Sequence, residues 1–196
     1  NQTTVELQSD AGDYIGGGNS YKYTQADAVI SVSVTGNHLS LRVAGDQGWT
    51  ADFQEPNSLT QLEVGTYSNL QRYPFHDPSK GGLSWSGEGR GCNTLQGWFA
   101  IDAVTYSNGV VTAIDLRFEQ HCEGSTPALR GTIHWDVNDT TAPPGPVNPP
   151  PANLWQPAAG ATPSSGNYVY LQSVPGDYIG MGNTNVYTQA DATISI

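Results

Sequence analysis

The carboxylates and serines of this chain are scattered, and none has a spacing that indicates catalysis. A glycosidase needs two carboxylates held at a defined separation across a cleft. Sequence spacing indicates no such pair among Glu88, Asp102, Glu119 and Glu123. The segment LSWSG at residues 83–87 does not fit the GxSxG nucleophile elbow of serine hydrolases. We therefore predict that the chain is not an enzyme.

Calcium is the one cofactor that the sequence supports as a hypothesis. Carboxylate oxygens are ligands that calcium prefers, although no EF-hand loop is present. The candidate ligands lie near the two ends of the long β-rich segment described below: Asp10, Asp13, Asp27, Asp136 and Asp139. The alternative is an acidic surface that only keeps the protein soluble, in which case no cofactor is expected.

Aromatic side chains beside polar ones indicate a candidate carbohydrate-binding site, because sugar rings stack on flat aromatic faces. The candidates lie in or beside predicted loops and strand ends: Asp46, Trp49, Tyr73, Phe75 and His76. The competing interpretation is that tryptophans of a β-sandwich fill its core. We expect the core position for Trp98 and Trp135, which lie inside alternating strands.

Two cysteines, Cys92 and Cys122, lack the CxxC spacing that is typical of zinc sites. We predict that they form one disulfide closing a loop of about 30 residues. A pair of free thiols or a metal site is the alternative. A disulfide would indicate an oxidising compartment.

The sequence around these cysteines contains SGEGRGCN at 86–93, FEQHCEG at 118–124 and PALRG at 127–131. This pattern, which covers roughly residues 82–135, resembles a family of uncharacterised secreted bacterial β-sandwich repeat domains. Such domains tend to occur in multi-domain surface or exported proteins, beside immunoglobulin-like or fibronectin-like modules. The resemblance implies a compartment and an architecture, and it carries no assigned chemistry.

Composition excludes several classes of partner. The formal net charge is −11, with seven Lys and Arg against 18 Asp and Glu. Nucleic acid and anionic membranes need a basic face, so we expect neither as a partner. No apolar run approaches the roughly 18 residues of a membrane-spanning helix. We expect an extracellular or cell-surface protein that does not span the membrane.

Short runs with alternating apolar residues predict an all-β fold. Two hairpins are clearest: residues 28–34 and 38–44 flank Thr35-Gly36-Asn37, and residues 98–106 and 110–121 flank Ser107-Asn108-Gly109. Further strands are predicted at residues 49–53, 62–67, 83–86 and 128–136. The predicted architecture is an antiparallel β-sandwich, immunoglobulin-like or jelly-roll-like, with a closed β-barrel as the alternative.

An internal repeat sets the expected domain organisation. Residues 4–32 recur at 168–196 with 19 identities in 29 positions. We predict a complete unit at 1–139, a proline-rich linker at 140–166 and the truncated start of a second unit at 167–196. The proline-rich core of the linker would span about 30 Å as a semi-rigid spacer. The glycine-rich GDYIGGG at 12–18 is expected to form a turn, because no helix follows it as in phosphate-binding loops.

About 30 residues cannot bury a core alone, so the second copy needs a partner. We expect its strands to add to the sheet edge of a neighbour, another copy of the chain or an adjacent repeat, and Trp155 to dock on a domain surface. The residues expected to be buried in this way are Val169, Leu171, Tyr178 and Ile179. The predicted function is a non-enzymatic extracellular structural or adhesive repeat protein, as a filament or surface stalk that assembles by strand sharing. The alternative is a carbohydrate-binding module, repeated for avidity on glycans.

Overall fold

The computed structural model describes residues 2–144 and 153–195 and contains twelve strands and no helix in that part of the chain. The chain falls into two compact units, Asn1–Pro146 and Val147–Ile196. The first unit contains β1 (Thr4–Ser9), β2 (Ser20–Thr24), β3 (Val29–Thr35), β4 (His38–Ala44), β5 (Gly48–Gln54), β6 (Gly65–Arg72), β7 (Gly82–Gly87), β8 (Leu95–Ser107), β9 (Val110–Cys122) and β10 (Leu129–Asp136). The second unit contains β11 (Tyr168–Gln172) and β12 (Thr184–Thr188).

The all-β prediction is confirmed. Among the described residues, no helix is long and apolar enough to cross a membrane. Residues 145–152, which include most of the proline-rich run in the predicted linker, lie outside the described residues.

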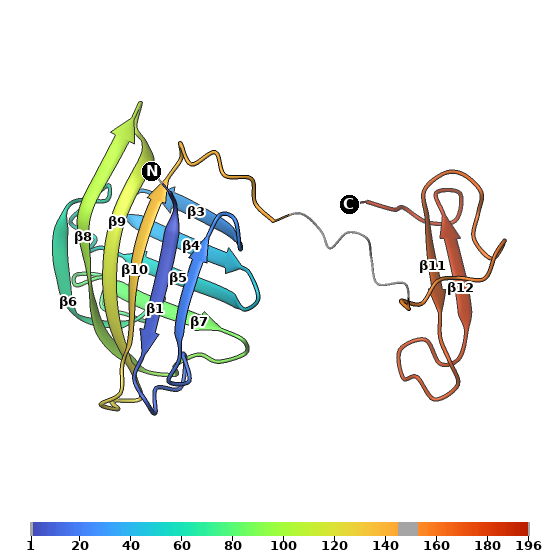
Figure 1. Cartoon of the computed structure of the whole chain (residues 1–196), viewed down its shortest axis with the longest axis horizontal. Coiled ribbons are helices and arrows are strands. Elements are labelled where there is room, and N and C mark those ends of the chain that lie inside the picture. The colour runs from blue at the N-terminus through green and yellow to red at the C-terminus, as the bar shows by residue number, and fades with distance from the viewer. Residues whose placement is uncertain (1, 145–152, 196) are drawn as a thin grey trace. The chain divides into compact units, whose positions relative to one another are not determined.

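The ten strands of the first unit form one sheet in the order β2-β1-β10-β9-β8-β6-β7-β5-β4-β3. All neighbours are antiparallel except β6 and β7, which pair in parallel through Gln71–Gly82 and Arg72–Leu83. This sheet folds over on itself, so that the layer with β1, β8, β9 and β10 crosses the layer with β3, β4, β5 and β7 (Figure 1). The sandwich and the barrel predicted as alternatives therefore describe one nearly closed sheet with two facing layers.

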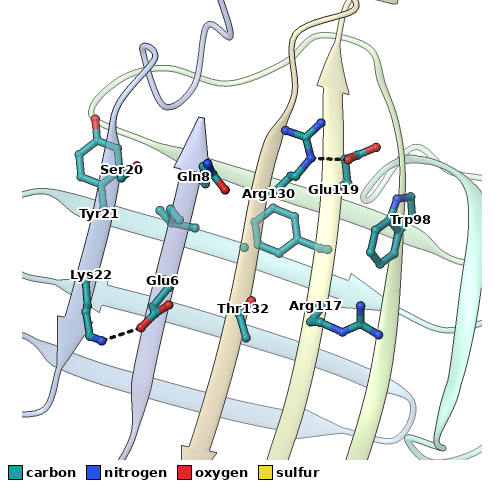
Figure 2. A pocket seen from close by; sticks show the side chains of 13 residues that line it. Glu6, Gln8, Ser20, Tyr21, Lys22, Trp98, Arg117, Glu119, Arg130 and Thr132 are labelled. Carbon is teal, nitrogen blue, oxygen red and sulfur yellow. Dashed lines mark hydrogen bonds and ion pairs between the residues drawn. The ribbon is translucent and has the colours of Figure 1, made fainter. Parts of the chain in front are cut away.

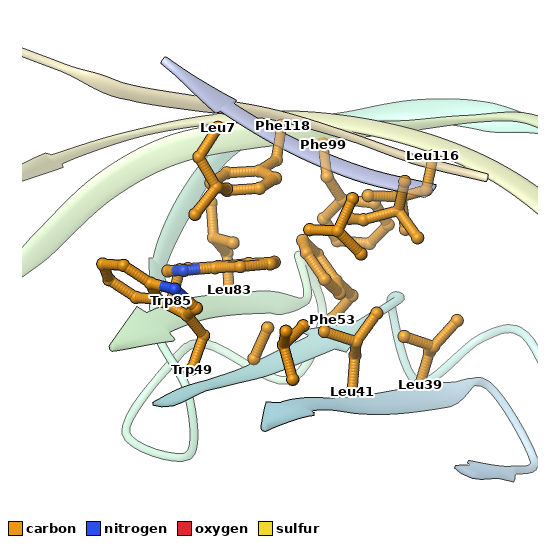
Figure 3. Packing of buried hydrophobic residues seen from close by; sticks show 14 of the residues in the cluster. Leu7, Leu39, Leu41, Trp49, Phe53, Leu83, Trp85, Phe99, Leu116 and Phe118 are labelled. Carbon is orange, nitrogen blue, oxygen red and sulfur yellow. The ribbon is translucent and has the colours of Figure 1, made fainter. Parts of the chain in front are cut away.

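The core between the two layers is aromatic (Figure 3). The Trp85 indole stacks on the Phe118 ring with 4.9 Å between the ring centroids. The centroid of Phe53 lies 5.5 Å from those of Phe99 and Phe118. Gly131 lies beside Phe118 on the adjacent strand, and a Cβ there would collide with the Phe118 ring. The glycine therefore makes room for the largest contact between the layers.

Two side-chain connections join segments that are not paired in the sheet. The predicted disulfide between Cys92 and Cys122 is formed, with a Cα–Cα distance of 5.0 Å. The side-chain amide of the fully buried Gln120 of β9 accepts a hydrogen bond from the backbone N–H of Trp85 and donates one to the backbone carbonyl of Trp85, both at 2.9 Å. Its amide thus satisfies backbone groups of β7 in the opposite layer, as a neighbouring strand would do.

Candidate functional site

The hairpin β11–β12 reproduces the hairpin β1–β2 in register. Val5 faces Tyr23 in the first hairpin, and Val169 faces Tyr187 at the same position in the second. In the first unit, β1 also pairs with β10 along its other edge. Within the described residues, β11 pairs only with β12, so the corresponding edge of β11 carries no partner strand.

The glycine-rich connection of each hairpin is held by the same hydrogen bonds. In the first copy, the buried Asp13 carboxylate accepts bonds from the Ser9 hydroxyl and the Gly16 N–H, both at 2.7 Å. In the second copy, Asp177 accepts bonds from Ser173 and Gly180 at the same distances. The loop donors are directed at an internal carboxylate, so the segment is a turn as predicted from sequence, and it offers no phosphate cradle.

The two hairpins differ in what covers their inward face. In the first unit, Val5, Leu7, Ile15 and Tyr23 are at most 3% exposed. Their identical counterparts in the second unit are exposed by 39% (Val169), 53% (Leu171), 87% (Ile179) and 42% (Tyr187). The second hairpin therefore presents to solvent the side chains that the first one buries in a core.

Tyr178 does not belong to this apolar face. It is 92% exposed, and its counterpart Tyr14 remains 60% exposed although the first hairpin is fully packed. The position points to solvent even in the docked hairpin, which argues against the predicted burial of Tyr178.

Trp155 packs on the second hairpin. Its indole stacks on the Tyr170 ring of β11 at 6.2 Å and remains 63% exposed. Glu6 and Lys22 form an ion pair of 2.7 Å on the outer face of the first hairpin. Tyr170 occupies the position of Glu6 in the second hairpin, and Val186 occupies the position of Lys22. In the second copy, aromatic and apolar side chains replace this ion pair.

The candidate sugar-binding residues do not form one surface. Trp49 is 1% exposed, and its Nε1–H donates to the Tyr23 hydroxyl at 3.1 Å inside the core. The proposal that Trp49 stacks on a sugar is therefore wrong for this fold. Asp46 lies nearby in the turn between β4 and β5, where it accepts a hydrogen bond from the Gln47 N–H.

The other three candidates lie at the opposite end of β4, beside His38. The Tyr73 ring stacks on the rings of His38 and His76, with centroid distances of 4.7 and 5.6 Å, so these two rings cover part of its surface. Phe75 is 75% exposed, with the Arg72 guanidinium 5.1 Å from the ring centre. Strand β4 has seven residues, which separates this group from the Asp46 turn by about 20 Å.

The calcium candidates are divided between the two ends of the first unit. Asp10 and Asp13 follow β1, whereas Asp136 ends β10 and Asp139 follows it, at the opposite end of the antiparallel pair. Asp27 binds the Thr24 N–H and hydroxyl. No group of three or more His, Cys, Asp or Glu residues gathers in a metal-binding arrangement in the described ranges.

The aspartates instead organise turns and ion pairs. Asp10 accepts hydrogen bonds from Arg130 at 2.7 Å and from the Ala128 N–H at 3.1 Å, and both interactions lower the pKa of its carboxyl. Asp139 accepts the Thr3 and Thr141 N–H groups, and the bond from Thr141 is the larger cause of its lowered pKa.

The structure identifies a buried carboxyl that the sequence interpretation missed. Glu55 is 1% exposed and accepts a hydrogen bond from the Glu63 N–H at 2.9 Å. Burial raises the pKa of Glu55 to about 7, although the hydrogen bond from the Glu63 N–H and the neighbouring Tyr67 hydroxyl act to lower it. A signal was available, because Glu55 continues the alternation of Trp49, Ala51 and Phe53, which all face inward.

Trp98 was also misplaced by the sequence interpretation. It does not fill the core but lies half-buried on the outer face of β8, where it is the cross-strand partner of Glu119 (Figure 2). Its neighbour Phe99 takes the inward position opposite Phe118. Trp135, which was expected to fill the core, is partly buried and packs against it.

Glu119 lies at the centre of a polar network on this outer face. Its Oε2 accepts a hydrogen bond from Arg130 Nε at 2.6 Å, and its Oε1 lies 3.2 Å from His121 Nε2. Burial raises the pKa of Glu119, but the bonds from His121 and Arg130 outweigh this effect and lower it overall. Open depressions of about 770 and 540 Å³ meet at Trp98 and Glu119.

Comparison of the chain with models of protein families, with curated proteins and with solved structures found no match.

Proposed function

We propose that this chain is a non-enzymatic extracellular structural or adhesive protein, built from repeated β units that assemble by sharing a hairpin between copies. The observation that carries the proposal is the apolar face of β11–β12. The apolar positions that are buried in the first hairpin are occupied by the same residue types in the second, where they are exposed, as the Leu7 and Leu171 pair illustrates.

The partner that fits this face is the first unit of another copy. A hairpin with the same inward side chains and the same turn fits the position that β1–β2 occupies beside β10. Fully burying a Val, Leu or Ile side chain contributes about 1.5–3 kcal/mol, so docking of Val169, Leu171 and Ile179 supplies several kcal/mol. Exchange of identical elements is a common route to assembly.

The exchanged hairpin is similar to the resident one but not equal to it. Val174 stands where Asp10 pairs with Arg130, so an exchanged hairpin leaves Arg130 with Glu119 alone. We therefore expect assembly that is reversible and depends on protein concentration. The disulfide between Cys92 and Cys122 supports a location outside the reducing cytosol.

A cysteine experiment tests the exchange directly. Glu6 of β1 faces Thr132 of β10, so Tyr170, which occupies the Glu6 position in β11, should face Thr132 of another copy after exchange. Chains carrying only Thr132→Cys and chains carrying only Tyr170→Cys are mixed under mild oxidation, with the native disulfide intact. The expected result is a covalent dimer that contains one chain of each kind.

The matched control is the double variant Glu6→Cys/Thr132→Cys, which should form the same bridge within one chain, because opposed Cβ atoms of paired strands lie about 4.5–5.5 Å apart. If this control forms its bridge and the mixture at high concentration yields no mixed dimer, strand sharing between copies is refuted.

A further inference from the structure

The outer face of the layer β2-β1-β10-β9-β8 carries a large share of the chain's few basic residues. Of the seven Lys and Arg residues in a chain of net charge −11, three line one depression on this face: Lys22, Arg117 and Arg130. This depression, of about 770 Å³, meets the second one, of about 540 Å³, at Trp98 and Glu119. The hollow surface thus extends over adjacent strands from β2 to β6, with the indole between its two parts.

Each of these cations is already neutralised by a neighbour. Lys22 pairs with Glu6 at 2.7 Å. Arg117 makes a two-bonded contact with Asp102, at 2.6 and 2.7 Å. Arg130 is held by both Glu119 and Asp10. The face therefore presents many hydrogen-bond donors and acceptors whose charges balance locally, and the ion pairs hold the guanidinium groups in fixed orientations.

This chemistry fits a ligand that is rich in hydroxyl groups and carries no charge. A sugar ring offers hydroxyls that both donate and accept hydrogen bonds, and an apolar ring face that packs on an aromatic side chain. An anionic ligand would have to displace the carboxylates that already pair with these cations. We propose that the outer face of this layer is a binding site for an uncharged polysaccharide chain, with the Trp98 indole as the stacking platform between the two depressions.

The same surface is not repeated in the second hairpin. Tyr170 and Val186 replace the Glu6–Lys22 ion pair at the edge of the depression, and Trp155 covers Tyr170. The proposed site therefore belongs to the first unit with its own hairpin in place, because Glu6, Gln8 and Lys22 of that hairpin line the larger depression. The part around Trp98 and Glu119 lies on β8 and β9, which an exchange of hairpins does not replace.

Calorimetric titration of the full chain tests the proposal. The probes are cellohexaose, xylohexaose, mannohexaose and maltohexaose, with hexagalacturonate as the charged comparison. We expect at least one uncharged hexasaccharide to bind at millimolar concentration or below, with an affinity that changes little with salt, because no counterions are released. Trp98→Ala should weaken binding about tenfold or more, because it removes the flat apolar face on which a sugar ring would pack.

Trp155→Ala, which removes an exposed indole from the other unit, is the matched control and should bind as the wild type does. Circular dichroism and thermal unfolding establish that Trp98→Ala is folded, as expected for a side chain outside the core. The proposal is overturned if no uncharged probe binds, if Trp98→Ala binds equally well, or if only hexagalacturonate binds with strong salt dependence. The mixed-cysteine experiment detects hairpin exchange, and the titration detects sugar binding. Failure of one proposal is therefore distinguished from failure of the other.

Discussion

At the scale of single residues, Glu55 is an ionisable group in a nearly water-free environment. Its carboxyl is almost completely buried, and the resulting pKa of about 7 lies well above the ordinary value of 4.5. The folded protein therefore holds this proton more tightly than the unfolded chain does. The stability that the tighter proton binding of Glu55 contributes is fully present below about pH 4.5 and is lost as the pH rises to about 7.

Glu55→Gln should remove this pH dependence. The amide carries no charge at any pH and keeps an oxygen that can accept the Glu63 N–H. At pH 8 we expect the variant to be more stable than the wild type by about 1–3 kcal/mol, the difference vanishing near pH 4.5. Burial lowers the pKa of His76, so the contribution of His76 to stability increases as the pH rises. This contribution is the same in the wild type and in the variant, so it cancels in the stability difference between them. Guanidinium unfolding of both proteins at several pH values measures this difference in unfolding free energy. If the free energies of the two proteins changed in parallel with pH, the raised pKa would not belong to Glu55.

The two misassigned tryptophans show what a local pattern can predict. In β5, Trp49, Ala51 and Phe53 alternate with polar residues, so the inward position of Trp49 and of Glu55 follows from sequence alone. In β8, all residues from Trp98 to Ile101 are apolar, and either face is compatible with the pattern. Only the pairing of Phe99 with Phe118 across the sheet, which is a long-range contact, turns Trp98 outward.

At the scale of elements, local turn chemistry and alternation predicted the hairpins well. The expected strands at 38–44 and 110–121 correspond to β4 and β9 almost residue for residue. The sequence interpretation did not identify β2, whose inward side chains are tyrosines in a polar segment. The parallel pairing of β6 with β7 was also missed, because no local signal specifies which distant strand is a neighbour.

Gln120 provides a test of how the two layers are joined. Gln120→Leu has a similar volume but leaves the Trp85 N–H and carbonyl without partners inside the core. We expect it to destabilise the first unit by about 2–4 kcal/mol, because two buried backbone groups lose their hydrogen bonds. Gln96→Leu on the adjacent strand, where the side chain is exposed, should change stability by less than about 0.5 kcal/mol. Equal effects of the two substitutions in denaturant unfolding would rule out the bridging role.

The turn of the hairpin offers a second test at this scale. Gly17 has φ +63°, and a Cβ there meets nothing closer than 3.5 Å, so only the left-handed backbone conformation opposes a side chain. Its counterpart Met181 adopts φ +54° and accepts that cost. Gly17→Met should therefore destabilise the first unit by about 1 kcal/mol. Gly131→Ala, where Phe118 blocks the Cβ, should cost clearly more, and a reversed order in thermal unfolding would contradict this explanation.

At the scale of the whole molecule, the chain contains one hairpin in two environments. The inward side chains are preserved in type and the turn keeps its hydrogen bonds, while other positions have changed: Val174 replaces Asp10, and Tyr170 replaces Glu6. This division is what a shared core contact requires, because inward residues must fit the same partner and outward ones are free to vary. The sequence alone predicted that the second copy would expose apolar strands, and only the structure separated the inward Ile179 from the outward Tyr178.

This separation makes assembly testable with neighbouring substitutions. Leu171→Asp places a charge on the inward face and should abolish concentration-dependent association in light scattering, because burying an unpaired carboxylate is strongly unfavourable. Tyr178→Asp lies on the same hairpin but on the position that stays exposed in the packed copy, so association should persist within about threefold of the wild type. Neither substitution lies in the first unit, whose unfolding transition should be unchanged and serves as the folding control. If Leu171→Asp associates as the wild type does, the inward face of β11–β12 is not the contact, and the shared hairpin must be abandoned as the basis of assembly.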